Sequence, residues 1–182
     1  AGQNEHFDES HLCSGPMPGD ALTQLVEREQ IKRLKYAYFR CLDQKLWDEL
    51  HGLFTADATA AYSGGKYSYS GRDAIVDFMR TNMSRESFHT SHRVHHPEID
   101  IDGDDATGTW AMDDVNVDSE FDFFLCGAGF YEDRYRRIDG EWKIAHTGYR
   151  RTFETIMPMG QNGMSLTASW WATGGQSALE VQ

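Results

Sequence analysis

The sequence is poor in cysteine, and it has no long apolar run. Three cysteines in 182 residues form an odd, scattered set with no CxxC pair, which does not make a disulfide framework. We therefore expect reduced thiols in a cytoplasmic protein, with Cys41 and Cys126 packed inside. No stretch approaches the roughly 20 apolar residues that span a bilayer, and nothing near the start of the chain resembles the apolar core of a signal peptide.

Basic residues are also scarce, because 17 Lys and Arg face 29 Asp and Glu and the net charge is -12. Binding to phosphate backbones depends on Lys and Arg that release counterions. Neither nucleic acid nor an anionic membrane is therefore an expected partner. The chain contains neither GxGxxG nor GxxxxGK[ST], so it predicts no nucleotide cofactor.

The chain has eight histidines, and four of them lie between positions 89 and 96. Zinc needs three or four converging ligands, whereas neighbouring side chains of a strand point to opposite faces. We expect no metal site here. Aromatic residues make up 13% of the chain, which fits either a pocket lined with rings or an aromatic core.

The chain divides into three parts. Residues 1–20 are polar and end in a cluster of Gly and Pro, which predicts a flexible N-terminal arm. Residues 21–157 carry regular hydrophobic patterns and are expected to form one α+β domain. Residues 158–182 are rich in glycine and contain Trp170 and Trp171; we expect this extension to cover the pocket mouth or a neighbouring subunit.

The first half of the domain shows mostly helical periodicity. A long helix is expected from Asp20 to about Asp43, and a short one around residues 46–54. Two short strands follow, at Ala58–Tyr62 and Lys66–Tyr69. The next helix is expected at Arg72–Met83, with Ser70 and Asp73 as a pair resembling a capping box.

The second half predicts long strands at residues 88–101, 105–117, 123–138 and 141–154. The pairs Asp102-Gly103 and Asp139-Gly140 are strong hairpin signals. Long antiparallel strands twist and bend, so the sheet has a concave face that three helices can cover. The expected fold is an α+β cone: a curved antiparallel sheet under about three N-terminal helices.

His92 is the candidate for proton transfer. Asp43 lies at the end of the first helix and can orient an imidazole, while Tyr38 and Tyr62 can donate hydrogen bonds to a developing oxyanion. Either Asp113 or Asp114 lies beside His92 on the next strand. We favour Asp114 as an assisting acid, because it shares a strand face with Trp110 and Met112.

Four motifs, in order along residues 22–154, resemble those of a known family. They are the helix segment Tyr38–Asp48, the Phe54-x-x-Asp57-Ala58 sequence, Thr90-Ser91-His92, and Asp139-Gly140-Glu141-Trp142-Lys143-Ile144. Together they resemble the SnoaL-like proteins of the nuclear transport factor 2 superfamily. The pattern is most similar to the dehydratase-like branch, which includes bile acid and scytalone dehydratases.

The resemblance implies a cofactor-independent lyase that acts on a hydrophobic cyclic molecule such as a steroid, bile acid or polyketide. Asp43 and His92 would form its catalytic dyad, with Tyr38, Tyr62 and Asp114 completing the catalytic set. A homo-oligomer is implied as well, either a trimer, which is favoured, or a dimer, assembled through the outer sheet face and the C-terminal extension. The expected substrate contacts are Trp110, Met112, His146 and Arg150, the last two assigned to the face of the final strand that carries Trp142 and Ile144.

Two other functions remain open at this level. Many cones of this type only hold a ligand or partner, and fold does not fix function. An isomerase or cyclase could use the same proton abstraction. The family's ketosteroid isomerases place their base near Tyr62 in this chain, so the carboxylate of that reaction is missing.

Overall fold

The computed structural model describes residues 18–179, and the first 17 residues of the predicted arm lie outside them. Residues 18–20 of that arm belong to the first helix. The elements are α1 (Pro18–Asp43), α2 (Trp47–Gly52), β1 (Phe54–Tyr62), β2 (Tyr67–Ser70), α3 (Arg72–Met83), β3 (Phe88–Asp102), β4 (Asp105–Asp118), β5 (Phe123–Ile138), β6 (Glu141–Pro158) and the short 3-10 helix η1 (Gly160–Asn162). No helix of this described part is long and apolar enough to cross a membrane.

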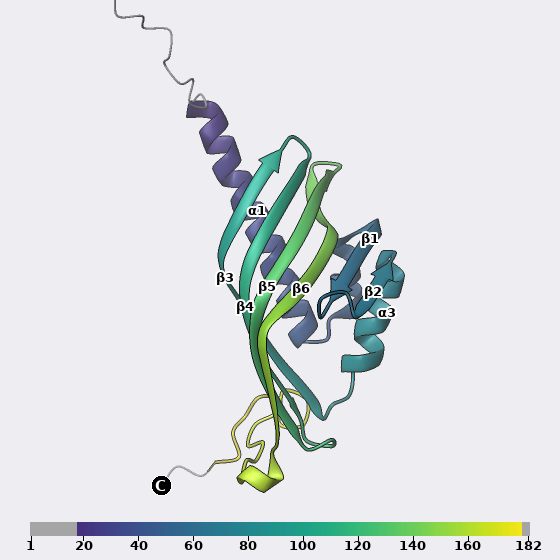
Figure 1. Cartoon of the computed structure of the whole chain (residues 1–182), viewed down its shortest axis with the longest axis vertical. Coiled ribbons are helices and arrows are strands. Elements are labelled where there is room, and N and C mark those ends of the chain that lie inside the picture. The colour runs from purple at the N-terminus through teal and green to yellow at the C-terminus, as the bar shows by residue number, and fades with distance from the viewer. Residues whose placement is uncertain (1–17, 180–182) are drawn as a thin grey trace, which may run out of the picture.

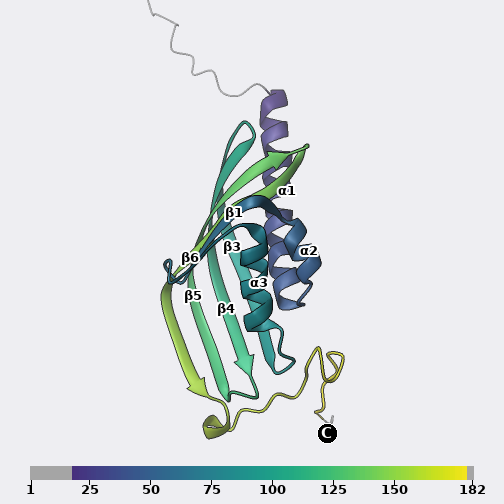
Figure 2. The same ribbon diagram turned by 90° about the vertical axis from the view of Figure 1, so that its right-hand side faces the viewer.

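The six strands form one bent sheet in the order β2-β1-β6-β5-β4-β3. Every neighbouring pair is antiparallel except β1 and β6, which run parallel. The long strands curve along their length (Figure 1), and the three α-helices lie on one face of the sheet (Figure 2). The predicted α+β cone is confirmed.

The strand limits follow their turn residues. Asp139 and Gly140 both have positive φ, at 52° and 82°, as a two-residue type I′ hairpin requires. In the first hairpin, Asp102 still pairs with Asp105. The first residue of the turn is therefore Gly103, whose φ is 60°, and not Asp102.

The start of α3 differs from the prediction. Its N-cap is Gly71, with φ at 86° and no side-chain capping hydrogen bond, so the proposed pairing of Ser70 with Asp73 is wrong. Asp73 instead bonds His51 of α2, with 2.7 Å between Oδ1 and Nε2. This contact links α2 to α3.

Two β-bulges in β6 decide which side chains face the helices. Tyr135 pairs with Ile144 while Arg134 pairs with His146, so Ala145 is an extra residue on β6. The register slips again between Ala128 and Gly129, where Thr152 is the extra residue. A bulge places two residues opposite one and shifts the alternation of faces.

The Ala145 bulge overturns one expectation from the sequence. His146 and Arg150 do not share the inner face with Trp142 and Ile144, because the extra residue turns both to the outer face. The same shift places Thr147, Tyr149 and Arg151 on the inner face. Simple alternation along the strand would have given the opposite assignment.

The core lies between the helices and the inner sheet face. The largest fully buried side chains include Trp110, Tyr38, Tyr135, Phe54 and Ile31. Cys41 is buried and Cys126 half-buried, and both are free thiols.

Beyond β6 the chain runs across the end of the sheet where α1 ends (Figure 2). The ring of Trp171 lies 4.5 Å from Lys45 Nζ, and Met159 and Ser169 are buried. These contacts attach the C-terminal segment to the loop that follows α1.

Candidate active site

A cavity of about 320 Å³ lies between the helices and the inner face of the sheet. One part of its wall is apolar, formed by Leu42, Phe78, Met79, Met83, Phe88 and Leu125. The other lining side chains are tyrosines, charged residues or other polar residues: Tyr38, Tyr62, Ser63, Lys66, Tyr67, Asn82, His92, Asp114, Asn116, Tyr131, Tyr149, Arg151 and Glu154. Ligand pockets typically combine apolar walls with a few polar groups that fix orientation.

Asp43 and His92 are hydrogen-bonded at this wall. His92 Nδ1 lies 2.7 Å from Asp43 Oδ1, and the backbone N–H of His92 donates to Oδ2 at 3.0 Å. Thr90 Oγ1 donates to Oδ1 at 2.8 Å. A carboxylate acceptor places the imidazole proton on Nδ1, so neutral His92 has its lone pair on Nε2. Phe39 stacks on the imidazole, with centroids 5.5 Å apart.

The end of α1 explains how Asp43 reaches His92 although Tyr38 points into the cavity. Leu46 N–H donates to Cys41 O at 2.8 Å and Lys45 N–H donates to Leu42 O at 3.2 Å, the bonding pattern of a Schellman motif. Lys45 holds the left-handed position with φ at 58°. Asp43 is therefore the last helical residue, and it contacts His92 from behind the cavity wall.

Four tyrosines gather on the inner wall. Tyr38 and Tyr62 place their hydroxyls 3.4 Å apart, and Tyr131 and Tyr149 lie beside them with ring centroids 5.2 Å apart. Burial raises the pKa of Tyr38, Tyr62 and Tyr131. These hydroxyls therefore stay protonated at neutral pH and can act as hydrogen-bond donors.

Asp114, not Asp113, faces the cavity, as the strand pattern predicts. Arg151 holds both of its carboxylate oxygens, with Nη2 to Oδ2 at 2.9 Å, and Asn116 Nδ2 donates to Oδ2 at 2.8 Å. Burial alone would raise the pKa of Asp114, but the hydrogen bonds and charge of Arg151 outweigh it and lower the pKa. Asp114 is thus a carboxylate at neutral pH, which contradicts its expected role as an acid. Asp113 is on the outer face, paired with Arg93 and His95.

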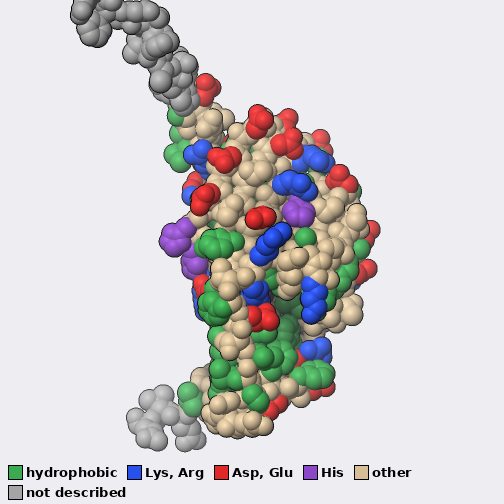
Figure 3. Space-filling view, in the orientation of Figure 1, with side chains coloured by type: hydrophobic (Ala, Val, Ile, Leu, Met, Phe, Trp, Pro, Cys, Tyr) green, Lys and Arg blue, Asp and Glu red, His purple; other side chains and the backbone are tan. Residues whose placement is uncertain are grey.

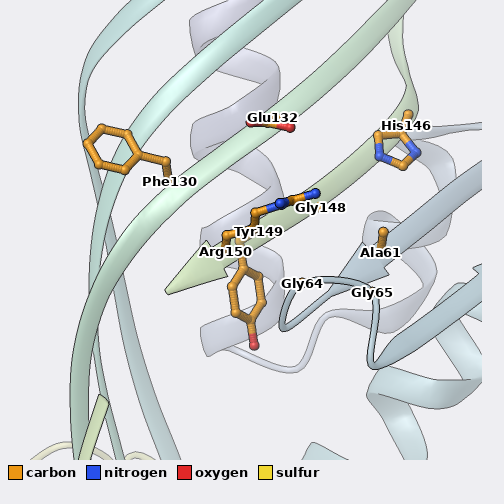
Figure 4. A pocket seen from close by; sticks show the side chains of 9 residues that line it. All are labelled: Ala61, Gly64, Gly65, Phe130, Glu132, His146, Gly148, Tyr149 and Arg150. Atoms are coloured by element: carbon orange, nitrogen blue, oxygen red, sulfur yellow. The ribbon is translucent and has the colours of Figure 1, made fainter. Parts of the chain in front are cut away.

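The four expected substrate contacts lie elsewhere. Trp110 and Met112 face inward but are packed in the core, where Trp110 Nε1 donates to Tyr135 OH at 2.9 Å. His146 and Arg150 line a separate hollow of about 210 Å³ on the outer face (Figure 4). His146 Nδ1 lies 2.7 Å from Thr59 Oγ1 in that hollow.

Other residues of the site escaped the sequence analysis. Tyr131 lies on β5 and Tyr149 on β6. The sequence pattern alone did not show which residues of these two strands face inward. Arg151 was passed over for its neighbour Arg150, because the bulges in β6 leave no mark on the hydrophobic pattern. Lys35 is fully buried beneath the tyrosines, and the sequence analysis did not single it out.

A family model described as the SnoaL-like domain matches residues 23–148. The chain therefore belongs to the SnoaL-like family. This match runs from within α1 to the middle of β6, so it includes both Asp43 and His92.

Solved structures share the fold. A protein of Novosphingobium aromaticivorans, provisionally assigned as a scytalone dehydratase, is 26% identical with a TM-score of 0.69, over 74% of this chain and 90% of that one. The hexachlorocyclohexane dehydrochlorinase LinA-type3 of Novosphingobium barchaimii is 20% identical with a TM-score of 0.68, over 75% and 94%. A single-residue variant of the protein Rv3472 of Mycobacterium tuberculosis, described as of unknown function, is 22% identical with a TM-score of 0.62, over 83% of each chain.

Proposed function

We propose that this protein is a cofactor-independent lyase that eliminates water, or a comparable leaving group, from a hydrophobic cyclic small molecule. The carrying observation is the 2.7 Å hydrogen bond between His92 Nδ1 and Asp43 Oδ1 at the wall of a largely apolar cavity. This geometry supports a role for His92 as the general base, with its own proton on Nδ1 and its Nε2 available to a carbon-bound proton.

In the first step, His92 Nε2 takes a proton from carbon. The electron pair of that C–H bond moves toward an adjacent carbonyl, and an enolate oxygen develops. The Asp43 carboxylate stabilises the imidazolium that forms. The hydroxyls of Tyr38 and Tyr62 donate to the oxygen as its charge grows, which is the arrangement that lowers the barrier most.

In the second step, the enolate re-forms the carbonyl and expels the hydroxyl on the neighbouring carbon. The imidazolium of His92 gives its proton to that hydroxyl, which leaves as water, so the base is regenerated and the atoms balance. Asp114 does not supply this proton, because its lowered pKa keeps it ionised. Its role in the proposal is to hold Arg151 in the cavity wall.

The cavity favours an uncharged substrate. Arg151 is paired with both Asp114 and Glu154, the latter with 2.9 Å between Nε and Oε2, so its charge is already balanced. Volumes near 300 Å³ lie at the lower end for ligand pockets, which fits a compact ring system. The names of the dehydratase and dehydrochlorinase neighbours describe eliminations, and they support the same reaction type here.

The test is a screen of steroid, bile acid and polyketide ring alcohols and hydroxyketones, analysed by mass spectrometry. A product that has lost water supports the lyase. A product of unchanged mass would instead identify an isomerase or cyclase, and tight binding without any product in the whole panel would identify a binding protein. Each positive compound is then tested with Asp43→Asn, in which a lyase of this mechanism loses turnover but keeps its fold.

We also propose a cytoplasmic homo-oligomer, with a trimer favoured and a dimer as the alternative. It would assemble through the outer sheet face, with the C-terminal segment lying over the pocket mouth or a neighbouring subunit. Hydrophobic side chains gather on the lower half of that face (Figure 3). The exposed side chains of Phe130 and Phe153 belong to β5 and β6. Light scattering on the purified protein measures the subunit number. Phe153→Ser should shift it toward monomer, whereas a monomeric wild-type chain would contradict this part of the proposal.

A further inference from the structure

Lys35 is a charged residue in the interior of the molecule. Its side chain is 0% exposed, and its Nζ lies 2.7 Å from Asp133 Oδ2, which is equally buried. Replacing a buried ion pair by apolar residues is often neutral or stabilising. Stability alone therefore does not explain why α1 and β5 carry this pair.

The carboxylate of Asp133 is held by further donors on its other sides. Thr147 Oγ1 donates to Oδ1 at 2.8 Å, and Tyr135 OH donates to Oδ2 at 2.7 Å. Trp110 Nε1 in turn donates to Tyr135 OH at 2.9 Å. Asp133 is thereby fixed, and it fixes the position of the Lys35 ammonium.

The ammonium is the member of the pair that contacts the cavity wall. Lys35 Nζ lies 3.7 Å from the centroid of the Tyr131 ring, 4.8 Å from that of Tyr38 and 5.0 Å from that of Phe39. Tyr131 and Tyr38 line the cavity, and Phe39 stacks on His92. Burial lowers the pKa of Lys35, and the charge and hydrogen bond of Asp133 oppose that shift and favour the ammonium form. The nitrogen of Lys35 thus lies against three rings that shape the site.

We propose that Lys35 is a positioning residue, whose ammonium, fixed by Asp133, holds the rings of Tyr131 and Tyr38 so that their hydroxyls converge on one oxygen of a bound ligand. This inference rests on the donor role of Tyr38 in the proposed function and extends that role to Tyr131, which lines the same cavity. A cation over an aromatic face is attracted to it by about 0.5–2 kcal/mol, and this attraction restrains the ring. The positive charge also favours an oxygen that gains negative charge in the cavity.

The test compares two ligands that differ by one hydroxyl, 2-naphthol and naphthalene, in binding measured by fluorescence. The wild-type protein is expected to bind 2-naphthol more tightly. In the double variant Lys35→Met/Asp133→Asn, which removes both charges and preserves volume, that preference should fall about three- to tenfold. Lys35→Gln/Asp133→Asn, which also removes both charges but keeps polar groups at both positions, gives the same comparison if the first double variant does not fold.

A matched control exists between the same two elements. Glu27 of α1 pairs with Arg137 of β5 at 2.6 Å, and the Arg137 guanidinium lies 4.7 Å from the Trp142 ring. Trp142 is a core residue outside the cavity wall. Glu27→Gln/Arg137→Met therefore removes an ion pair and a cation–ring contact, and it should leave the preference for 2-naphthol unchanged.

Three results would overturn the inference. They are a wild-type protein that does not prefer 2-naphthol, a preference that survives in the folded Lys35 variant, and an equal loss of affinity for both ligands, which indicates a purely structural role. Because the measurement needs no turnover, it is separate from the lyase test. A protein that discriminates through Lys35 but yields no elimination product loses only the proposed reaction.

Discussion

Two carboxylates of the site, Asp114 in the cavity wall and Asp43 behind it, are each held by nitrogen donors, yet their chemistry differs. Asp43 holds an imidazole through one nitrogen, so the other nitrogen of His92 can take up and release a proton. Asp114 is held on both oxygens by Arg151, whose pKa is raised, so neither partner exchanges protons near neutrality.

This difference separates a reactive pair from a rigid one within a single cavity. A histidine partner leaves its second ring nitrogen free for proton transfer, whereas a bidentate arginine offers no such site and adds geometric rigidity. Burial and proximity alone therefore do not identify a catalytic carboxylate. The identity of its partner does.

The largest expected effect is on the reactive pair. Asp43→Asn should lower turnover of a dehydration substrate by about 10³–10⁴-fold, because the amide no longer enforces the productive tautomer of His92. Loss of water is followed by mass spectrometry, and the melting temperature is recorded alongside. Turnover within tenfold of the wild type would show that the pair is not catalytic.

The rigid pair should instead control stability. Asp114→Asn leaves the guanidinium of Arg151 without its buried partner, and we expect a loss of about 3–5 kcal/mol in the free energy of unfolding, measured with urea. The neighbouring Asp113→Asn is the control: its carboxylate is exposed, and the expected change is below about 1 kcal/mol. Equal losses in the two variants would contradict the comparison.

The tyrosine donors come next in size. Tyr38→Phe removes one hydroxyl that faces the developing oxyanion and should lower kcat about 10²-fold with little change in KM. The control is Tyr36→Phe, two residues earlier at an exposed position of α1, which should change neither kcat nor KM. An effect confined to KM would indicate simple substrate binding through Tyr38.

Acid sensitivity sharpens the comparison further. The pKa of Asp114 is lowered in the folded protein despite its burial, so its contribution to stability is complete above the unfolded value near 3.9 and is lost as pH falls through the folded value. Urea midpoints measured from pH 6 down to pH 3 should drop, and Asp114→Asn should flatten that drop. A variant with the same slope as the wild type would contradict the assignment.

The smallest expected effect is on the outer face. Arg150→Ala should change turnover less than about twofold, because an exposed side chain away from the cavity is usually near neutral. Arg151→Met, one residue further along, should reduce both stability and turnover. If Arg150→Ala were the damaging substitution of the two, the placement of the bulges in β6 would be wrong.

Local signals predicted most of the fold. The turn residues Gly103, Asp139 and Gly140 mark the hairpins, and alternating patterns between them mark the long strands. The order of the motifs predicted that Asp43 and His92 would meet. Such features are visible because each depends on a few residues close in sequence.

The remaining features depend on registers and depths that a linear pattern does not encode. The bulge at Ala145 is not visible in the hydrophobic pattern of the strand, so His146 and Arg150 were assigned to the wrong face. Trp110 was assigned to the correct face of its strand. The sequence did not show, however, that this part of the strand lines the core and not the cavity. Lys35 is charged, and its burial depends on Asp133 almost a hundred residues away.

The extra residue at position 145 also sets how this strand tolerates length changes. Removing Ala145 would take out the bulge and leave each following residue of β6 on its present face, because Ile144 and His146 already lie on opposite faces. A one-codon deletion at this position is therefore expected to preserve the lining of the chamber. The bulge is thus a point where the gene can lose a codon while the interior chemistry stays the same.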